Sequence, residues 1–163
     1  MKGWEKDKNW SDRFVIQIKR ILGEHLIGPA PEEEDNERNT DLIVLKMEPV
    51  RIACRIRRNE YREKYEHEFT VRTFRPSGAK TELAKIIEGW GNYFFYGFAN
   101  DKATALCSWS LVDLNVFRLW FSRRIIKNAG VMPGRGNINK DNSSHFRAFD
   151  FNELPKEFII AKN

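Results

Sequence analysis

Arginines recur in one stretch of the chain with a spacing that suits phosphate recognition. Arg51, Arg55 and Arg57 share the same parity within residues 50–58, and Arg72 follows in a second alternating run. In an extended strand, residues of the same parity point to the same face of the sheet. A guanidinium group binds phosphate oxygens through two parallel hydrogen bonds. These four arginines are therefore candidate nucleic-acid-binding residues.

A second interpretation of the same arginines is a solvated basic face held by ion pairs. Acidic residues follow closely along the chain, at Glu60, Glu63, Glu66 and Glu68. Surface ion pairs of this kind are common and contribute little to stability. The sequence leaves both interpretations open.

These arginines must be positioned by strands, and the hydrophobic periodicity predicts where the strands lie. In residues 50–58 the arginines are expected to face solvent and the apolar residues between them the core. In residues 67–75, Phe69 and Val71 are expected to face inward and Thr70 outward. Further strands are predicted at residues 41–47, 93–98, 105–112, 145–151 and 158–160, and helices at residues 10–26, 81–88 and 114–127, the last capped by Asp113.

This order of elements predicts an α/β (α+β) fold. The three strands that follow the first helix are joined by short links, so we expect them to form an antiparallel three-strand meander. The next helix must cross over before the following strand, which gives a mixed sheet with helices packed on it.

Length and composition predict one domain over residues 1–163, with 41% hydrophobic and 31% charged residues. The net charge is +5 although five acids lie between Glu32 and Glu37, in a predicted acidic loop at residues 29–39. A flexible loop rich in Gly and Asn is predicted at residues 130–144. The first residues are charged and no apolar run reaches membrane-span length, so we expect a cytoplasmic protein with no membrane partner.

Other familiar motifs are incomplete. Two cysteines and three histidines make no zinc-binding pattern. Residues 77–81 resemble the end of a P-loop but lack its leading glycine and spacer. Residues 134–137 are either a phosphate-binding clasp or an ordinary surface loop.

The chain resembles the core of the PD-(D/E)xK nuclease superfamily over roughly residues 10–120. The resemblance lies in the first helix with Glu24, the strand that begins at Asp41, and the helix and strand of residues 82–96. It implies Mg²⁺-dependent hydrolysis of phosphodiester bonds, in which carboxylates hold the ion and a lysine neutralises developing charge. The chain departs from the superfamily pattern in its next predicted strand, residues 50–58, which has arginines where the superfamily has Glu-x-Lys.

Within the superfamily, the acid or the lysine of this motif can be supplied from a neighbouring element. The resemblance therefore implies that other residues of this chain replace the motif. Asp41 and Glu68, with Glu24 as a third member, would bind Mg²⁺, and Lys85 would replace the missing lysine. Asp41, Glu68 and Lys85 are then the candidate catalytic residues. The alternative is that Asp41 caps a turn, Glu68 pairs with an arginine and Lys85 is a charge on the surface of a helix.

The chain also looks like a group of uncharacterised phage and prophage proteins. The residues behind this resemblance include residues 68–72, 77–78, 89–91 and 95–97. We therefore expect a phage-associated, nuclease-like protein that binds nucleic acid, with DNA as the expected form, in the cytoplasm of a host cell. The alternative is a catalytically inactive scaffold that acts as a phage accessory factor on nucleic acid or on a host protein. The oligomeric state stays open.

Overall fold

The computed structural model describes residues 3–29, 42–44, 50–139 and 143–163. The chain divides into two compact units, Met1–Val50 and Arg51–Asn163. The first unit contains helices α1 (Gly3–Asp12) and α2 (Val15–Leu26) and the antiparallel pair of β1 (Ile27–Pro29) and β2 (Leu42–Val44). Most of the predicted acidic loop, and the rest of the strand predicted at residues 41–47, lie outside the described residues. The expectation of one domain over residues 1–163 stays a prediction.

The single helix predicted at residues 10–26 is two helices in the structure. A turn at Arg13 and Phe14 separates α1 from α2. The backbone N–H of Phe14 donates to the carbonyl of Ser11, three residues back, which is the tighter bond that often closes a helix. The rings of Trp10 and Phe14 still meet edge to face, with centroids 5.3 Å apart.

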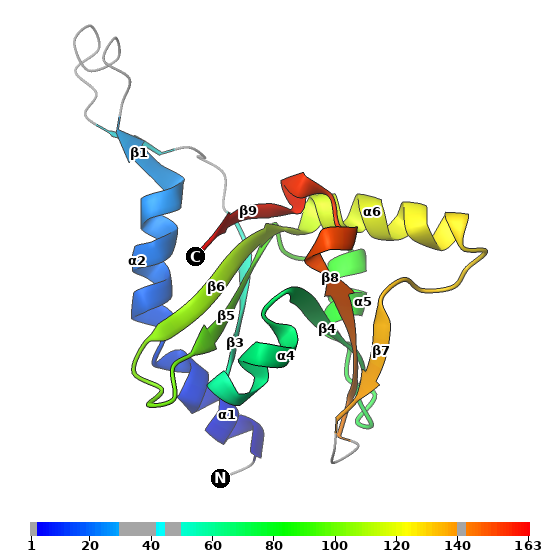
Figure 1. Ribbon diagram of the computed structural model, residues 1–163, viewed down its shortest axis with the longest axis horizontal. Helices are drawn as coiled ribbons and strands as arrows, with labels where there is room; N and C mark the ends of the chain where they lie inside the picture. Colours follow the sequence, from blue (N-terminus) through cyan, green and yellow to red (C-terminus); the bar gives the residue numbers. More distant parts are fainter. Residues whose placement is uncertain (1–2, 30–41, 45–49, 140–142) are drawn as a thin grey trace, which may run out of the picture. The chain divides into compact units, whose positions relative to one another are not determined.

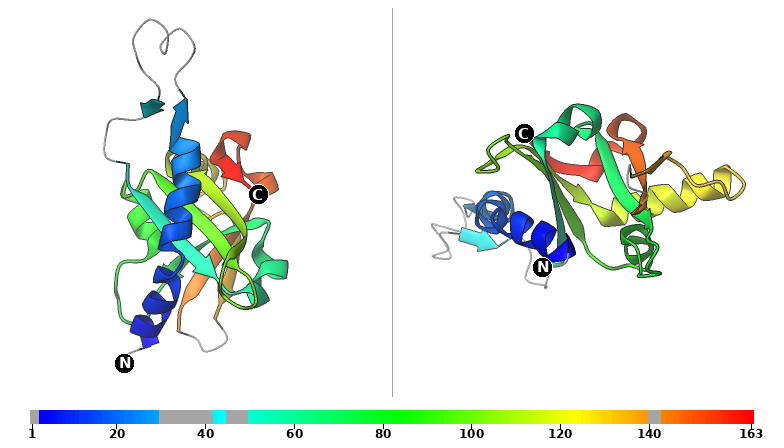
Figure 2. Two further views of the ribbon diagram at one scale, coloured as in Figure 1. Left: turned by 90° about the vertical axis from the view of Figure 1, so that its left-hand side faces the viewer. Right: turned by 90° about the horizontal axis from the view of Figure 1, so that it is seen from below.

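The second unit is an α+β arrangement of two sheets (Figures 1 and 2). Its strands are β3 (Ile52–Arg57), β4 (Glu68–Phe74), β5 (Tyr93–Ala99), β6 (Leu106–Asp113), β7 (Arg135–Ile138), β8 (His145–Asp150) and β9 (Ile159–Lys162). Its helical segments are η1 (Asn59–Tyr61), α4 (Arg62–Tyr65), α5 (Glu82–Ile87), α6 (Leu114–Lys127), η2 (Phe151–Glu153) and η3 (Lys156–Phe158). One sheet has the order β3-β5-β6-β9 and is mixed, because β3 and β5 are parallel. The other has the order β4-β8-β7 and is antiparallel.

The predicted meander of three consecutive strands is wrong. β2 pairs with β1, β3 with β5 and β4 with β8, so the antiparallel three-strand sheet is built from other strands. The link between β3 and β4 coils into η1 and α4, and β4 belongs to the second sheet. Alternating hydrophobicity identifies a strand but carries no information about its partner when the partner lies far along the chain. The predicted crossover before β5 is confirmed by the parallel pairing of β3 with β5.

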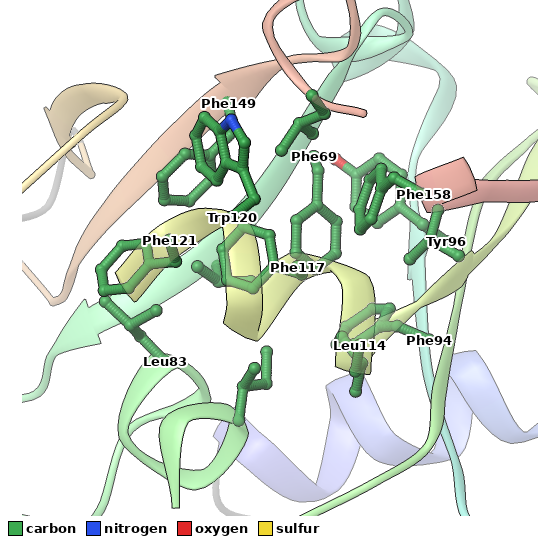
Figure 3. Close-up of a cluster of buried hydrophobic side chains, with 14 of the residues drawn as sticks. Phe69, Leu83, Phe94, Tyr96, Leu114, Phe117, Trp120, Phe121, Phe149 and Phe158 are labelled. Atoms are coloured by element: carbon green, nitrogen blue, oxygen red, sulfur yellow. The ribbon is translucent and has the colours of Figure 1, made fainter. Parts of the chain in front are cut away.

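The core of the second unit is a cluster of aromatic rings around α6. Phe69 on β4 is fully buried, and the centroid of its ring lies 5.3 Å from the ring centroids of Phe94, Phe117 and Phe158. Figure 3 shows these rings converging from β4, β5, α6 and η3. Edge-to-face packing of this kind adds stability beyond the burial of apolar area. It fixes β4 against the sheet that contains β3, and so positions the candidate site.

The helix cap predicted at Asp113 is confirmed, and Thr81 supplies a second cap that was not predicted. Asp113 Oδ1 accepts hydrogen bonds from the backbone N–H groups of Asn115 and Val116, at 2.7 and 3.2 Å, and begins α6. The Thr81 hydroxyl accepts from the N–H of Ala84 and begins α5. Both satisfy donors that a helix leaves unpaired at its start.

Among the described helices, none has both the length and the apolar character needed to cross a membrane. The cytoplasmic location stays a prediction.

Residues 135–138, inside the loop predicted to be flexible, form β7 and pair with β8. Gly134 explains how the chain reaches this strand. Its φ is +80°, and a Cβ added there would lie 2.7 Å from the ring of Phe149 and 2.8 Å from the carbonyl oxygen of Ala148. Only glycine fits such a close approach in a left-handed conformation.

We expect Gly134→Ala to lower the free energy of unfolding by about 2 kcal/mol, because it adds both backbone strain and overpacking against Phe149. Urea unfolding followed by circular dichroism measures this change. Gly136→Ala is the matched control, since a Cβ there meets nothing within 4 Å. It should change stability by less than about 0.5 kcal/mol. Equal effects of the two variants would contradict the account of Gly134.

Candidate nucleic-acid interface

The arginines of β3 alternate as predicted, but Arg55 and Arg57 face β4 and the interior of the second unit. Both bond to Thr70 of β4, and on the opposite face of β3 the thiol of Cys54 is exposed. The prediction that these two arginines point to solvent is therefore wrong. A period of two separates the faces of a strand without saying which one is covered. Tyr96 and Phe98, which pair with Arg55 and Arg57 in β5, are buried beside them on this face.

Thr70 joins β4 to β3 through both arginines. Its carbonyl oxygen accepts a hydrogen bond from Arg55 at 2.9 Å, and its hydroxyl accepts one from Arg57 at 2.8 Å. The same hydroxyl lies 3.0 Å from Tyr96 Oη, in a hydrogen bond for which either group can be the donor. Thr70 is fully buried, contrary to the outward orientation predicted for it. Buried polar groups that are paired in this way hold one arrangement of the strands.

Glu82, the first residue of α5, is the acid of this network. Its carboxylate forms an ion pair with Arg55 and accepts the backbone N–H of Arg72 at 2.9 Å. Side-chain exposure is 15% for Arg55 and 26% for Glu82. Burial alone would raise the pKa of Glu82, but Arg55, the N–H of Arg72 and the Arg72 charge outweigh burial and hold that pKa below its ordinary value.

Arg57 lies among aromatic rings. Its guanidinium carbon is 4.7 Å from the ring centroid of Tyr65, 5.6 Å from Phe146 and 5.7 Å from Tyr61. Burial is the main cause that lowers the pKa of Arg57, while Tyr96 acts in the opposite direction. The cation–π contacts compensate part of the cost of moving this charge out of water.

Positive charge exceeds negative charge in this region. The pKa of Arg72 is lowered, first by burial and then by the charges of Arg55, Arg75 and Arg57. The charge of Glu82 acts in the opposite direction. We define the arginine cluster as Arg55, Arg57, Arg72 and Arg75. Three of these arginines, Arg55, Arg57 and Arg72, interact with the one carboxylate of Glu82, and Arg75 interacts with Arg72.

Two donors of the arginine cluster lack acceptors. The Nε atoms of Arg57 and Arg75 are buried and have no hydrogen-bond partner among the described residues. Leaving a buried donor unpaired costs about 1–3 kcal/mol, and more when the group is charged. An oxyanion between these arginines would supply both the acceptors and the negative charge.

The structure brings together three of the four arginines predicted to bind nucleic acid. Arg55, Arg57 and Arg72 belong to the cluster, whereas Arg51 precedes β3, is exposed, and bonds through its backbone to Asn92. Thr70 and Arg75 also belong to the site, although neither was predicted as a member. The signal for Thr70 was its parity with Arg72 in β4.

The predicted metal and catalytic residues are dispersed in the described part of the chain. Both carboxylate oxygens of Glu68 accept hydrogen bonds from Arg135, at 2.9 Å. Glu24 belongs to α2 in the first unit and lies 4.0 Å from Arg20. Lys85 is exposed on α5, and Asp41 lies outside the described residues. Within residues 3–29, 42–44, 50–139 and 143–163, no group of three metal-binding side chains is found.

The lowered pKa of Glu82 predicts a loss of stability in acid. A carboxyl whose pKa is lower in the folded state stabilises the fold above its ordinary pKa, near 4.5, and this contribution is lost as the pH falls through the lowered value. Urea unfolding between about pH 6 and pH 3 should therefore show a smaller pH dependence in Glu82→Gln than in the unmodified protein. Parallel profiles for the two proteins would contradict this assignment.

The fold and the site together define an α+β protein with a half-buried arginine cluster where β3 meets β4. No family model, curated protein or solved structure matches the chain. The likeness to PD-(D/E)xK nucleases and to phage proteins stays a prediction from the sequence, and function is inferred from the geometry of the site.

Proposed function

We propose that this protein binds nucleic acid by placing backbone phosphates at the arginine cluster. The observation that carries the proposal is the pair of buried, unpartnered Nε–H donors on Arg57 and Arg75. Two oxygens of a phosphate accept two parallel hydrogen bonds from one guanidinium group, and a neutral acceptor matches this geometry less well. Arg55 and Thr70 hold the arginines in place before the ligand arrives, which lowers the entropy cost of binding.

The charge of the whole chain favours a polyanion over a small anion. The sequence has 28 Lys and Arg against 23 Asp and Glu, and five of these acids lie together at residues 32–37. The other residues therefore carry 28 basic side chains against 18 acidic ones. An excess of this size attracts the extended charge of a nucleic-acid backbone and speeds encounter.

Fluorescence anisotropy with labelled single-stranded and duplex DNA of about 20 nucleotides tests the proposal. We expect binding at low salt and an affinity that falls by about tenfold or more between 50 and 200 mM salt, since several phosphates are neutralised. The comparison of the two DNA forms identifies the preferred one. Absence of binding to both forms at low salt, or an affinity that does not change with salt, would overturn the proposal.

Hydrolysis is a second proposal, favoured by the position of Glu68. This residue shares β4 and its face with Thr70 and Arg72, so a metal ion held there would lie next to a phosphate at the arginine cluster. Mg²⁺ would activate water for attack on phosphorus if Asp41 joins Glu68 as a ligand. Cleavage of plasmid, single-stranded DNA and RNA with Mg²⁺ or Mn²⁺ against chelator tests this step.

The variants Asp41→Asn, Glu68→Gln and Lys85→Gln locate the catalytic residues in that assay. Cutting that needs metal and disappears in Asp41→Asn and Glu68→Gln supports a nuclease. No cutting by folded protein that still binds DNA supports the inactive scaffold, a phage accessory factor that acts by binding.

A further inference from the structure

Large apolar side chains are exposed on one side of α6 and just after the helix. Leu119 is 61% exposed and Ile126 is 81% exposed, at a spacing that places both on one face of the helix. Val131 and Met132 follow the helix and are exposed as well. Figures 1 and 2 show the C-terminal end of α6 projecting beyond the strands of the second unit. Clustered exposed apolar residues on a surface mark interaction sites more often than single ones do.

A basic groove lies beside these apolar residues. Its volume is about 440 Å³, and it is lined by Trp120, Arg123, Arg124, Lys127, Glu153, Leu154 and Pro155. Arg124 covers the Trp120 ring, with the guanidinium carbon 5.7 Å from the ring centroid. Arg123 lies on the helix between Leu119 and Ile126, so the cationic wall of the groove borders the apolar face. Three cations and one acid give this wall a net positive charge.

We propose that this α6 surface, meaning the groove together with Leu119 and Ile126, docks an acidic amphipathic segment of a partner protein. Carboxylates of the partner would pair with Arg123 and Lys127, while its apolar side chains cover Leu119 and Ile126. The combination of an apolar centre with complementary charges at the rim is the usual composition of a protein interface.

The same features disfavour nucleic acid as the occupant. Trp120 is only 9% exposed and is covered by Arg124, so its face is not open to a stacking base. Aliphatic residues such as Ile126 have no counterpart on a phosphate backbone. An anionic membrane would also attract these cations, and vesicles are therefore included in the test below.

The test uses the full chain and a labelled synthetic helical peptide of about 18 residues in which Leu forms one face and Glu the other. Its counterpart with Lys in place of Glu is the matched comparison. We expect the Glu peptide to bind and the Lys peptide to bind at least about tenfold more weakly. The double variant Arg123→Glu, Lys127→Glu should weaken the Glu peptide by at least about tenfold, and Ile126→Ser by about fivefold.

Lys102→Glu, on an exposed turn between β5 and β6, is the control charge reversal and should leave peptide binding unchanged. Arg72→Gln should leave it unchanged too, so failure here is distinguishable from failure of the proposed nucleic-acid function. The proposal is overturned if both peptides bind alike. It is also overturned if single-stranded DNA or phosphatidylglycerol vesicles, and not the Glu peptide, depend on Arg123 and Lys127.

Discussion

Replacing Glu82 with alanine is expected to lower the free energy of unfolding by about 3 kcal/mol, because it removes one partner of a largely buried ion pair. Arg55 would keep its charge in a site that is 15% exposed and already surrounded by arginines. The backbone N–H of Arg72 would also lose its acceptor. Urea unfolding at neutral pH measures the change.

Glu88→Ala is the matched control for Glu82→Ala. Glu88 follows α5 directly and pairs with Lys80 at 2.6 Å, but this pair is about half exposed on both sides. Exposed pairs contribute little, so we expect a loss of less than about 0.5 kcal/mol. If Glu82→Ala and Glu88→Ala destabilise the protein equally, the pair with Arg55 is not what joins α5 to β3 and β4.

The double variant Arg72→Gln, Arg75→Gln is expected to weaken DNA binding by about 100-fold. Each substitution removes a charged donor to phosphate, and such hydrogen bonds contribute about 1.5 kcal/mol each. Neither side chain holds the strands together as Arg55 does, so the variant should remain folded. Anisotropy at low salt measures the affinity, and circular dichroism checks the fold.

Arg51→Gln separates the prediction made from sequence parity from the one made from structure. Arg51 shares its parity with Arg55 and Arg57 but lies outside the arginine cluster, exposed before β3. Its loss should weaken binding by no more than about threefold, the effect of one peripheral charge. A loss for Arg51→Gln as large as that for the double variant would move the interface to the outer end of β3.

Local features of the fold were predictable because neighbouring residues determine them. Asp113 is followed by an apolar stretch with helical spacing, and it caps α6 as expected. The continuous apolar run at β5 gave a buried strand, since no polar residue interrupts it. These signals act within one or two turns of chain.

Strand pairing and strand orientation were not predictable in the same way. β4 pairs with β8, about 80 residues further along the chain, and no local signal selects that partner. The interior position of Arg57 depends on rings from three separate elements, at Tyr65, Tyr96 and Phe146. An arginine in an alternating strand is therefore ambiguous until the aromatic residues that would surround it are placed.

The candidate site was predictable in its residue types and only partly in its membership. Arg55, Arg57 and Arg72 follow from their spacing, but Thr70 becomes part of the site only when β3 and β4 face each other. Glu68 illustrates the reverse case. It was expected to bind metal, and its carboxylate accepts hydrogen bonds from Arg135 on β7, a strand that the periodicity did not predict.

The most direct test of the arginine cluster is the ¹H–¹⁵N spectrum of the arginine Nε–H groups during titration with single-stranded DNA. Burial should slow exchange of the Arg57 and Arg75 groups enough to observe them in the free protein. We predict that both resonances shift on binding, because a phosphate oxygen becomes their acceptor. Shifts at exposed arginines such as Arg51, with the Arg57 and Arg75 resonances unchanged, would contradict the proposal that phosphate occupies this cluster.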